Sequence, residues 1–389
     1  MTILAHFTLA CAALASCLPS SALAASIDSR AISPWTNFNN NVVFRPPADW
    51  TDPRTLYART LQLSDKSLLA TCEIYAPDDP LSLPIFRSTD GGATWKEYIR
   101  FYDKVNGWGM RYQPFLYVLP QDFGGYKAGT ILAVGTSVPK DLSQAYIDIY
   151  ASTDKAKTFN FISHIAYGPG PETVPNGNKA IWEAFLLMYQ GKLVAFYSDQ
   201  RDPNYGQKLV HTTTTNLRDW SPIVDDVAMP YYDGRPGMTT VAYSKKSKKY
   251  VMTFENCGSE KNCQVNYKVS DSPLTFASAP YSPIVSNDTA QVSPYGSPYI
   301  IWTSKPGATD GSGIFIANGN YDASVYINDD RALPQNWKRV SINQKDGYSR
   351  ALRIISNTKG QQKLLVASAG NFGEPDTNAL TVGVLDVPS

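Results

Sequence analysis

The sequence lacks any excess of charge. Its 389 residues carry 35 Lys and Arg against 34 Asp and Glu, which gives a formal net charge of +1, and no block of basic residues is present. Nucleic acids and anionic membrane surfaces attract proteins through clustered positive charge. We therefore expect neither a nucleic-acid partner nor a membrane partner.

Histidine and cysteine are also scarce. His164 and His211 follow the N-terminal apolar segment and lie in no metal-ligand or nucleophile motif, so we interpret both as packing or surface residues. No motif demands a metal ion or another cofactor, and we expect none. Cys257 and Cys263 are close enough in sequence to close a small disulfide loop, whereas Cys72 lies in an apolar run and is predicted to be a buried free thiol.

Long apolar runs are missing except at the N-terminus. The run Ile3 to Ala15 is followed by small residues that end in Ala22-Leu23-Ala24, the pattern of a secretory signal peptide with its cleavage site. The run is shorter than the roughly 18 residues that span a bilayer. We therefore predict a signal peptide at 1–24, an N-terminal extension at 25–40 and one large domain at 41–389 of a secreted, extracellular protein.

What the sequence does have is a repeat of about sixty residues. Ser88 to Trp95 matches the Asp-box pattern S-x-D-x-G-x-T-W, and Ser152 to Phe159 is a degenerate copy. The aromatic residues that end these and three looser copies are 64, 61, 56 and 61 positions apart: Trp95, Phe159, Trp220, Phe276 and Trp337. In such a box, Ser and Asp side chains bond nearby backbone N–H groups, so it is a hairpin with a structural role.

Short β-rich runs follow the same period, beginning near Leu68, Ile131, Leu193, Tyr250, Ile314 and Leu364. Another apolar run precedes each of them, and helical periodicity is nearly absent. Four strands per repeat predict an all-β fold, a six-bladed β-propeller with Asp-box hairpins. The last repeat ends too early for its fourth strand. We predict that the N-terminal strand Asn41 to Phe44 supplies it and closes the ring.

The first strand of each propeller blade lines the central channel, so its polar residues are candidates for ligand contact. They are Arg59, Gln113, Glu183, a Gly-Met segment after Arg235, a Pro-Tyr segment at Pro294, and Arg350. The otherwise apolar strand around Glu183 should raise the pKa of this carboxyl group, as a proton donor requires. Glu255 ends the second strand of the next blade, and adjacent blades can bring the two carboxylates to one rim.

Two carboxylates about 5–5.5 Å apart support retaining glycoside hydrolysis, and roughly 6.5–9.5 Å implies inversion. Glu73 is a rival for Glu255, because it holds the same position in its own strand. The alternative for each is a structural carboxylate bonded to backbone or arginine. Asp199 and Arg201 belong to a polar segment that suits either a rim loop for sugar hydroxyls or a turn.

Five longer segments are more specific than the Asp-box: Trp182–Leu187, Phe196–Pro203, Gly206–His211, Arg235–Val241 and Met252–Glu255. The chain resembles, through them, the fungal exo-α-1,5-L-arabinanases of glycoside hydrolase family 93. The resemblance implies a retaining enzyme that releases arabinobiose from the non-reducing end of linear arabinan, with Glu183 and Glu255 as the catalytic pair. It departs from the family at Ala184, where a proline is expected, which puts rate and subsite details in doubt.

From its apolar surroundings we assign Glu183 as general acid/base, and Glu255 as nucleophile, although the two roles are interchangeable at this stage. Arg59, Arg235 and Arg350 are candidates to hold furanose hydroxyls, and Trp182 is a candidate stacking face for the sugar. We expect a monomer that acts on arabinan or arabino-oligosaccharides.

Two other readings stay open. Phe44-Arg45-Pro46-Pro47 faintly resembles the F-R-I-P element of sialidases, whose arginine triad grips a carboxylate; Arg59, Arg235 and Arg350 would have to form that triad. The other reading is a catalytically inactive, sugar-binding propeller, because a fold does not dictate function.

Overall fold

The structure, a computed structural model, describes residues 35–389 apart from 259–261. The predicted signal peptide at 1–24 lies outside the described residues, as does most of the predicted extension. The described part contains 24 β-strands, two short 3₁₀-helices (Phe276–Ser278 and Pro334–Asn336) and no α-helix. No helix in it is long and apolar enough to cross a membrane. The prediction of an all-β protein is confirmed.

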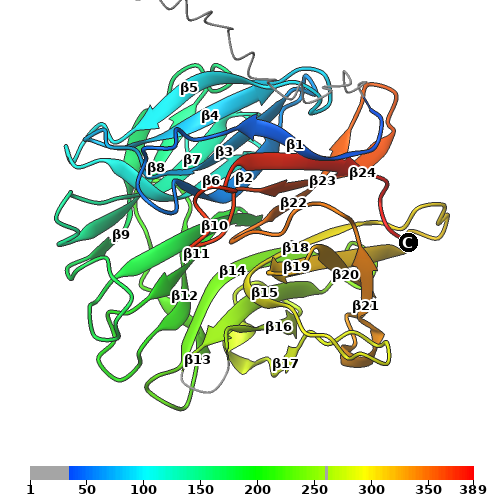
Figure 1. Ribbon diagram of the computed structural model, residues 1–389. Helices are drawn as coiled ribbons and strands as arrows, with labels where there is room; N and C mark the ends of the chain where they lie inside the picture. The colour runs from blue at the N-terminus through cyan, green and yellow to red at the C-terminus, as the bar shows by residue number, and fades with distance from the viewer. Residues whose placement is uncertain (1–34, 259–261) are drawn as a thin grey trace, which may run out of the picture. The chain divides into compact units, whose positions relative to one another are not determined.

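The strands form four four-stranded sheets and one larger sheet, with antiparallel neighbours throughout (Figure 1). The first sheet contains β2 (Thr55–Gln62), β3 (Leu68–Ile74), β4 (Ser82–Ser88) and β5 (Lys96–Tyr102). The second contains β6 (Met110–Val118), β7 (Ile131–Ser137), β8 (Ala145–Ser152) and β9 (Asn160–Gly168). The third contains β10 (Ile181–Tyr189), β11 (Lys192–Asp199), β12 (Lys208–Thr214) and β13 (Val224–Ala228).

The larger sheet follows in the chain. Its strands are β14 (Arg235–Tyr243), β15 (Tyr250–Cys257), β16 (Gln264–Ser270), β17 (Tyr281–Pro283), β18 (Tyr295–Ser304), β19 (Gly313–Asn320), β20 (Ser324–Asp329) and β21 (Lys338–Ser341). A single residue pair, Gln264 with Tyr295, links β16 to β18. The last sheet contains β22 (Ala351–Ser356), β23 (Gln362–Ser368), β24 (Leu380–Leu385) and β1 (Phe38–Phe44).

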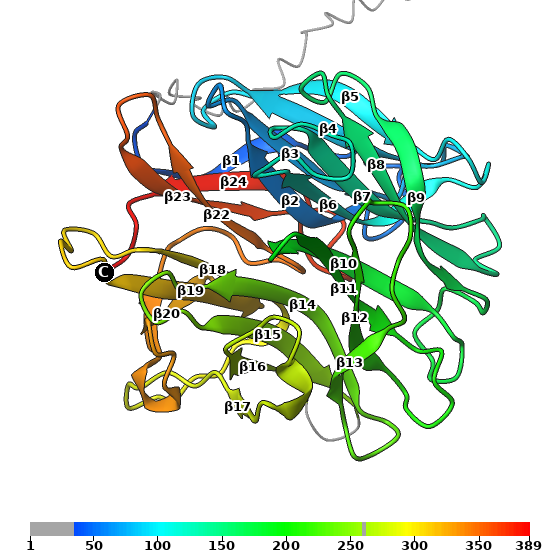
Figure 2. The same ribbon diagram turned by 180° about the vertical axis from the view of Figure 1, so that it is seen from behind.

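The sheets have a propeller arrangement, fanning out from a common centre (Figures 1 and 2). Strands β2, β6, β10, β14, β18 and β22 lie innermost, each contacting the next, and β22 contacts β2. The next strand outward is apolar and buried over most of its length; β3, for example, is buried at every residue. Neighbouring sheets cover both faces of this second strand. Its residues are therefore mostly apolar along the whole strand and do not alternate between apolar and polar.

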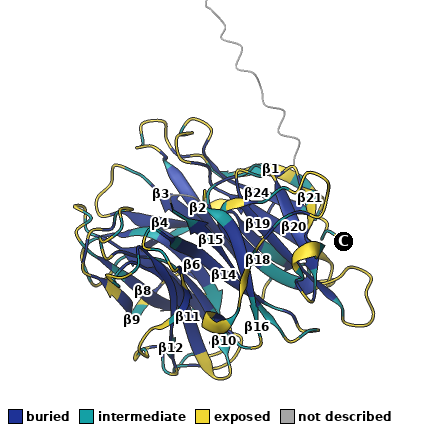
Figure 3. Ribbon diagram, turned by 90° about the horizontal axis from the view of Figure 1, so that it is seen from below, coloured by how far each residue is buried: buried dark blue, intermediate teal, exposed yellow. Residues whose placement is uncertain are grey.

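Burial follows this layering, with dark-blue strands inside and exposed residues mostly in the connecting loops (Figure 3). The predicted runs at Leu68, Ile131, Leu193, Tyr250, Ile314 and Leu364 begin within two residues of β3, β7, β11, β15, β19 and β23. Burying each Leu, Ile or Val side chain contributes about 1.5–3 kcal/mol. The repeated apolar runs are therefore the main source of stability.

The Asp-boxes are hairpin turns with the predicted hydrogen bonds. In the first, the Ser88 hydroxyl accepts from the backbone N–H of Gly92 at 2.9 Å, and Asp90 accepts from the backbone N–H of Thr94 at 2.9 Å. The Trp95 indole donates back to the Gly92 carbonyl at 2.9 Å. Ser152 and Asp154 repeat the pattern between β8 and β9. These turns lie between outer strands, as their structural role predicts.

Strand β1 pairs antiparallel with β24, with Asn41 opposite Val382. It begins at Phe38, three residues before the predicted start at Asn41. The Asn41 side chain also donates to the Gly92 and Ala93 carbonyls at 2.9 and 3.0 Å, which ties β1 to the first Asp-box turn. Without β1, strand β24 would be the edge of its sheet. Strand β1 therefore gives the last strand of the chain a hydrogen-bonding partner on that side.

Candidate active site

The innermost strands share a backbone distortion at the same end. Five of them carry a residue of positive φ near their start, and the sixth such residue lies just before β22: Tyr57, Gln113, Glu183, Met238, Ser297 and Ser349. The register of β2, β6, β10, β14 and β18 shifts at this point, as in a β-bulge. A bulge re-aims a side chain and its N–H group, and here it sets what faces the centre.

A cavity of about 540 Å³ lies at this end. Four glutamates line it: Glu73, Glu172, Glu183 and Glu255. Aromatic and polar side chains complete the lining, among them Tyr57, Tyr75, Tyr112, Trp182, Gln207, Arg235 and Tyr348. A second cavity of about 470 Å³ adjoins it and shares Glu255, Cys263, Tyr348 and Phe372. A larger hollow of about 580 Å³ lies over β19–β21, but no glutamate lines it.

Glu183 is the bulge residue of β10. Its Oε2 atom accepts hydrogen bonds from the Ser198 hydroxyl at 2.7 Å and from the backbone N–H of Met238 at 2.9 Å. Burial raises the pKa of Glu183, while the two hydrogen bonds and the charge of Arg235 oppose that rise. The carboxylate is thus buried but well supported in its ionised form.

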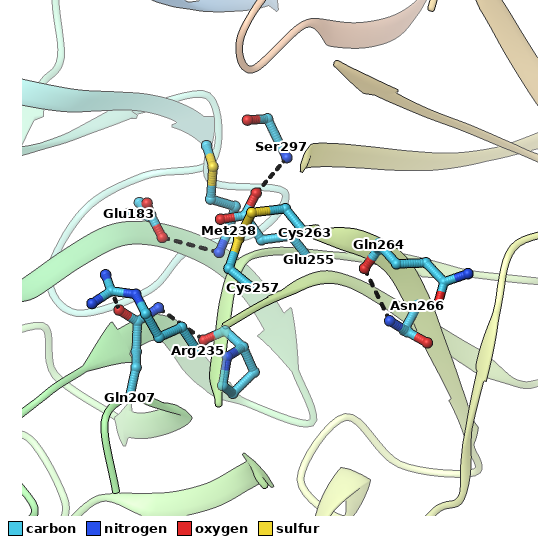
Figure 4. Close-up of a disulfide and its surroundings, with 11 residues drawn as sticks. Glu183, Gln207, Arg235, Met238, Glu255, Cys257, Cys263, Gln264, Asn266 and Ser297 are labelled. Carbon is cyan, nitrogen blue, oxygen red and sulfur yellow. Dashed lines mark hydrogen bonds between the residues drawn. A yellow bond between two sulfur atoms is a disulfide. The ribbon is translucent and has the colours of Figure 1, made fainter. Parts of the chain in front are cut away.

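Glu255, near the end of β15, has less support. Among the described residues, its Oε2 atom accepts one hydrogen bond, from the backbone N–H of Ser297 at 2.6 Å (Figure 4). Burial and the nearby charge of Glu183 raise the pKa of Glu255 to about 7. This carboxyl group can therefore gain and lose a proton near neutral pH.

Gly237 lies between the two carboxylates. A β-carbon there would lie 3.4 Å from Oε1 of Glu255 and 3.6 Å from Oε2 of Glu183, so these oxygens are at most about 7 Å apart. It would also approach the Gln207 amide to 2.9 Å, which leaves no room for a side chain. In the structure Glu183 and Glu255 approach one point of the cavity, as the sequence led us to expect. They do so although Ala184, and not a proline, follows Glu183.

Glu73 on β3 has the same design as Glu255. Its Oε1 atom accepts from the backbone N–H of Gln113, the bulge residue of the next innermost strand, at 2.8 Å. The Tyr75 hydroxyl donates to Oε2 at 3.0 Å. Burial raises the pKa of Glu73 to about 7. The equivalence with Glu255 that the sequence indicated therefore holds, and Glu73 faces the same cavity.

Among the predicted substrate contacts, Trp182 and Arg235 line the cavity. Arg235 is bonded to protein groups there: it donates to the Val174 carbonyl, to Asn176 Oδ1 at 2.9 Å and to Gln207 Oε1 at 3.1 Å. Its side chain thus fastens the connection between β9 and β10 to the cavity wall.

Arg59 and Arg350 do not border the cavity, which does not fit their predicted contact with sugar hydroxyls. Arg350 is fully buried and donates to the carbonyls of Gly319 and Ser324 at 3.2 and 2.8 Å. Arg59 lies 4.0 Å from the Tyr57 ring centroid and donates to the Ser349 hydroxyl at 2.7 Å. Tyr57 and Tyr348, two residues before Arg59 and Arg350 in the sequence, line the cavity instead.

Asp199 and Arg201 also lie away from this cavity. Arg201 donates to both carboxylate oxygens of Asp199, at 2.9 and 2.6 Å, and to the Tyr197 hydroxyl at 2.8 Å. The pair lines a separate hollow of about 450 Å³ with Asp202 and Lys208. Of the two interpretations of this segment, the structure supports a local turn.

The sialidase reading needs three arginines around one carboxylate. Only Arg235 of the three candidates faces the cavity, and Arg45 of the Phe-Arg-Pro-Pro element is exposed. The arginine triad therefore does not form.

The structure adds residues that the sequence reasoning missed, among them Glu172, Gln207, Tyr57, Tyr112 and Tyr348. Tyr57 depends on a bulge that no residue pattern marks. Glu172 had a signal, the long Gly- and Pro-containing connection at 169–180, because long loops in compact domains are commonly functional.

Cys257 and Cys263 form the predicted disulfide, and Cys72 is the predicted buried free thiol. The two sulfur atoms near Glu255 are bonded to each other, so they do not make a metal site with its carboxylate. The Nδ1 atoms of His164 and His211 form hydrogen bonds with the carboxylates of Asp148 and Asp226, at 2.7 and 2.9 Å. Both histidines are packing residues.

Solved structures provide relatives. A GH93 α-L-arabinofuranosidase of Fusarium graminearum, solved with arabinobiose, is 39% identical and has a TM-score of 0.84, covering 90% of this chain and 98% of that one. A Penicillium chrysogenum α-L-arabinanase, also solved with arabinobiose, is 41% identical with the same TM-score and coverage. A Streptococcus pneumoniae sialidase, 8% identical with a TM-score of 0.56 over 90% of this chain and 71% of that one, shares the fold alone. No protein-family model and no curated protein matches the chain.

The relatives at 39–41% identity are glycoside hydrolases, and the protein is a glycoside hydrolase as well. The similarity extends over nine tenths of the chain. The chain belongs to glycoside hydrolase family 93, which confirms the family resemblance of its sequence.

Proposed function

We propose that the protein is a secreted, retaining exo-glycosidase that releases arabinobiose from the non-reducing end of linear α-1,5-L-arabinan. The observation that carries this proposal is the convergence of Glu183 and Glu255 beside Gly237, within about 7 Å of each other. That limit accommodates the roughly 5–5.5 Å of a retaining pair. The arabinobiose bound to the two family members supports the choice of sugar.

The hydrogen bonds favour Glu183 as nucleophile and Glu255 as general acid/base, which is the reverse of the assignment made from the sequence. Glu183 has two donors and a nearby arginine, which keep a nucleophile ionised. Glu255 has one donor and a pKa of about 7, which suits the group that must both give and take a proton. Apolar neighbours in the strand suggested the reverse, but they gave no sign of the hydrogen bonds that the Glu183 carboxylate accepts from Ser198 and Met238.

The reaction then has two steps. Glu255 gives its proton to the glycosidic oxygen while Glu183 attacks the anomeric carbon, so that the C–O bond to the leaving chain breaks and a glycosyl–Glu183 ester forms. Ionised Glu255 next takes a proton from water, and the resulting attack on the anomeric carbon frees Glu183 and the sugar with its configuration retained.

The two cavities support exo action on a chain. Glu255 borders both of them, so the leaving part of the substrate belongs in the adjoining cavity, on the side of the acid. That cavity is lined by Tyr295, Tyr321 and Phe372, which are 47, 60 and 53% exposed. Exposed aromatic rings offer flat apolar faces to sugars. The connection 169–180 lies on the other side, where the non-reducing end would stop.

We further propose a closed ring of six blades within a single domain at 41–389, with a monomeric protein. The contacts between β22 and β2, and the pairing of β1 with β24, support closure. The single residue pair between β16 and β18 supports counting the larger sheet as two blades. The disulfide favours an oxidising compartment and hence export after removal of 1–24.

Product analysis tests the function. On linear arabinan we expect arabinobiose from the first time point, without longer oligosaccharides, and no release of sugar from a sialoside. Glu183→Gln and Glu255→Gln should each lose at least about a thousandfold in kcat with an unchanged melting temperature. Inertness of the wild-type protein on both substrates would favour a sugar-binding propeller instead.

Azide separates the two catalytic roles. With an activated aryl glycoside, Glu255→Ala should be rescued by azide to a glycosyl azide of retained configuration, because Glu183 still forms the ester. Glu183→Ala should give an azide of inverted configuration. The opposite pattern would restore the first assignment.

A further inference from the structure

The connection between β9 and β10, residues 169–180, forms one wall of the main cavity through Glu172 and Val174. The protein fixes it there by several polar contacts. Arg235 donates to the Val174 carbonyl and to Asn176, and the Glu172 backbone N–H donates to the Leu142 carbonyl at 2.7 Å. These contacts hold the backbone of the connection at Glu172 in place.

The Glu172 side chain is buried but has no protein partner of normal hydrogen-bond geometry. The residue is 4% exposed, and neither carboxylate oxygen makes a hydrogen bond within the described residues. The backbone amide of Ile181 approaches the group and partly offsets the effect of burial on its pKa. Burial, with the charges of Glu183 and Glu73, nevertheless raises the pKa of Glu172 well above its ordinary value, which favours the protonated form of its carboxyl group.

A second unpaired polar atom lies in the same wall. The indole nitrogen of Trp182 is buried and has no hydrogen-bond partner among the described residues. A buried polar group without a partner costs about 1–3 kcal/mol. Two such groups beside one cavity are the arrangement expected where a ligand supplies the missing partners.

Backbone contacts and cavity linings locate Glu172 relative to the adjoining aromatic cavity. The Glu172 backbone N–H is held by the Leu142 carbonyl, in the connection between β7 and β8. The adjoining cavity is instead lined by Glu255 and by residues in or beside β18 and β19, and Glu172 is not among its lining residues. We therefore place Glu172 on the side away from the leaving chain.

We propose that Glu172, together with the indole N–H of Trp182, binds hydroxyl groups of the second sugar, the one beyond the sugar that is attacked. This inference rests on the proposed function. A neutral carboxylic acid both donates and accepts a hydrogen bond, which matches a sugar hydroxyl. The pair thereby makes the enzyme require a disaccharide unit, because a shorter substrate leaves both buried groups without partners.

The test compares an aryl α-L-arabinobioside with the aryl α-L-arabinofuranoside that lacks the second sugar. In Glu172→Leu we expect kcat/KM to fall about 10- to 100-fold on the disaccharide, mainly through KM, and to change less than about twofold on the monosaccharide. Glu172→Gln, which keeps a donor and an acceptor, should stay within about fivefold of wild type on both. Equal losses on the two substrates, or no loss on either, would overturn the inference.

Two further measurements keep the result interpretable. The melting temperature of Glu172→Leu should not fall, because the substitution removes an unpaired buried polar group. Calorimetric titration with arabinobiose should show affinity about tenfold weaker for Glu172→Leu than for Glu172→Gln. If wild type hydrolyses neither aryl substrate, the proposed function fails, and this titration alone decides whether Glu172 binds the sugar; equal affinities would refute it.

Discussion

At the scale of single residues, the site depends on backbone N–H groups that come from the neighbouring part of the propeller. Glu73, Glu183 and Glu255 each accept one, from Gln113, Met238 and Ser297 respectively. All three donors have positive φ. Glu183 and Glu73 each accept a second hydrogen bond, from the hydroxyls of Ser198 and Tyr75, and such a bond stabilises the ionised form. Glu255 has no second donor among the described residues.

The pH dependence of activity follows from these partners. In the proposed mechanism Glu255 must carry a proton to act as acid, and burial and the charge of Glu183 raise its pKa to about 7, so kcat/KM should fall about tenfold per pH unit above that value. Glu183 must be ionised in the same mechanism, so its protonation should limit activity on the acidic side of the profile. Initial rates on arabino-oligosaccharides between pH 4 and 9 would measure both limits.

Glu73 provides the control, since burial raises its pKa to about 7 as well. In Glu73→Gln the alkaline loss of activity should remain. Its disappearance would assign the titration to Glu73 and make that residue the acid. An aryl substrate whose leaving group needs no proton should show a weaker alkaline loss in the wild-type enzyme.

At the scale of elements, the bulge connects the fold with the chemistry. Ser297 has φ +46, and its backbone N–H holds Glu255, while its own hydroxyl makes no hydrogen bond with any described residue. A β-branched residue is an outlier in this left-handed conformation. We expect Ser297→Val to lower kcat at least about tenfold and stability by about 1–2 kcal/mol.

Ser297→Ala is the matched control, because alanine has no β-branch. It removes only a hydroxyl that makes no hydrogen bond with the described residues. Its kcat and urea midpoint should stay close to wild type. Comparable losses in the two variants would mean that the hydroxyl matters, and that the N–H to Glu255 is not what positions the carboxylate.

The same bulges mark the limit of what the sequence predicts. Buried strands such as β3 and β7 begin where the runs near Leu68 and Ile131 predicted them, because an apolar run between turns strongly favours a buried strand. Glu183 and Glu255 were predicted because their strands and their family resemblance are distinctive. Arg59 and Arg350 do not line the cavity. For Arg59 the reason is the register shift between Leu56 and Arg59, which changes the residue that faces the cavity and which no side-chain pattern signals.

At the scale of the whole molecule, the catalytic pair depends on the packing between sheets. Glu183 belongs to β10 and Glu255 to β15, and they meet at Gly237 of β14. No single sheet contains the site, so its geometry is only as rigid as the contacts among the innermost strands. Those contacts run from β2 to β22 and back to β2, and what holds β22, β23 and β24 in place therefore bears on catalysis.

Removal of strand β1 tests whether the packing between sheets depends on the pairing of β1 with β24. A chain that starts after Arg45 would lose β1, leave the edge of β24 unpaired and release the Asn41 contacts with Gly92 and Ala93. An exposed strand edge also invites association. We expect this truncation to lower the melting temperature by several degrees and to promote aggregation, whereas a chain starting at Ala25 should behave as the full mature protein. Light scattering and a thermal scan would measure both effects, and a truncated chain as stable and monodisperse as its control would show that the β1–β24 pairing is not needed to hold the sheets together.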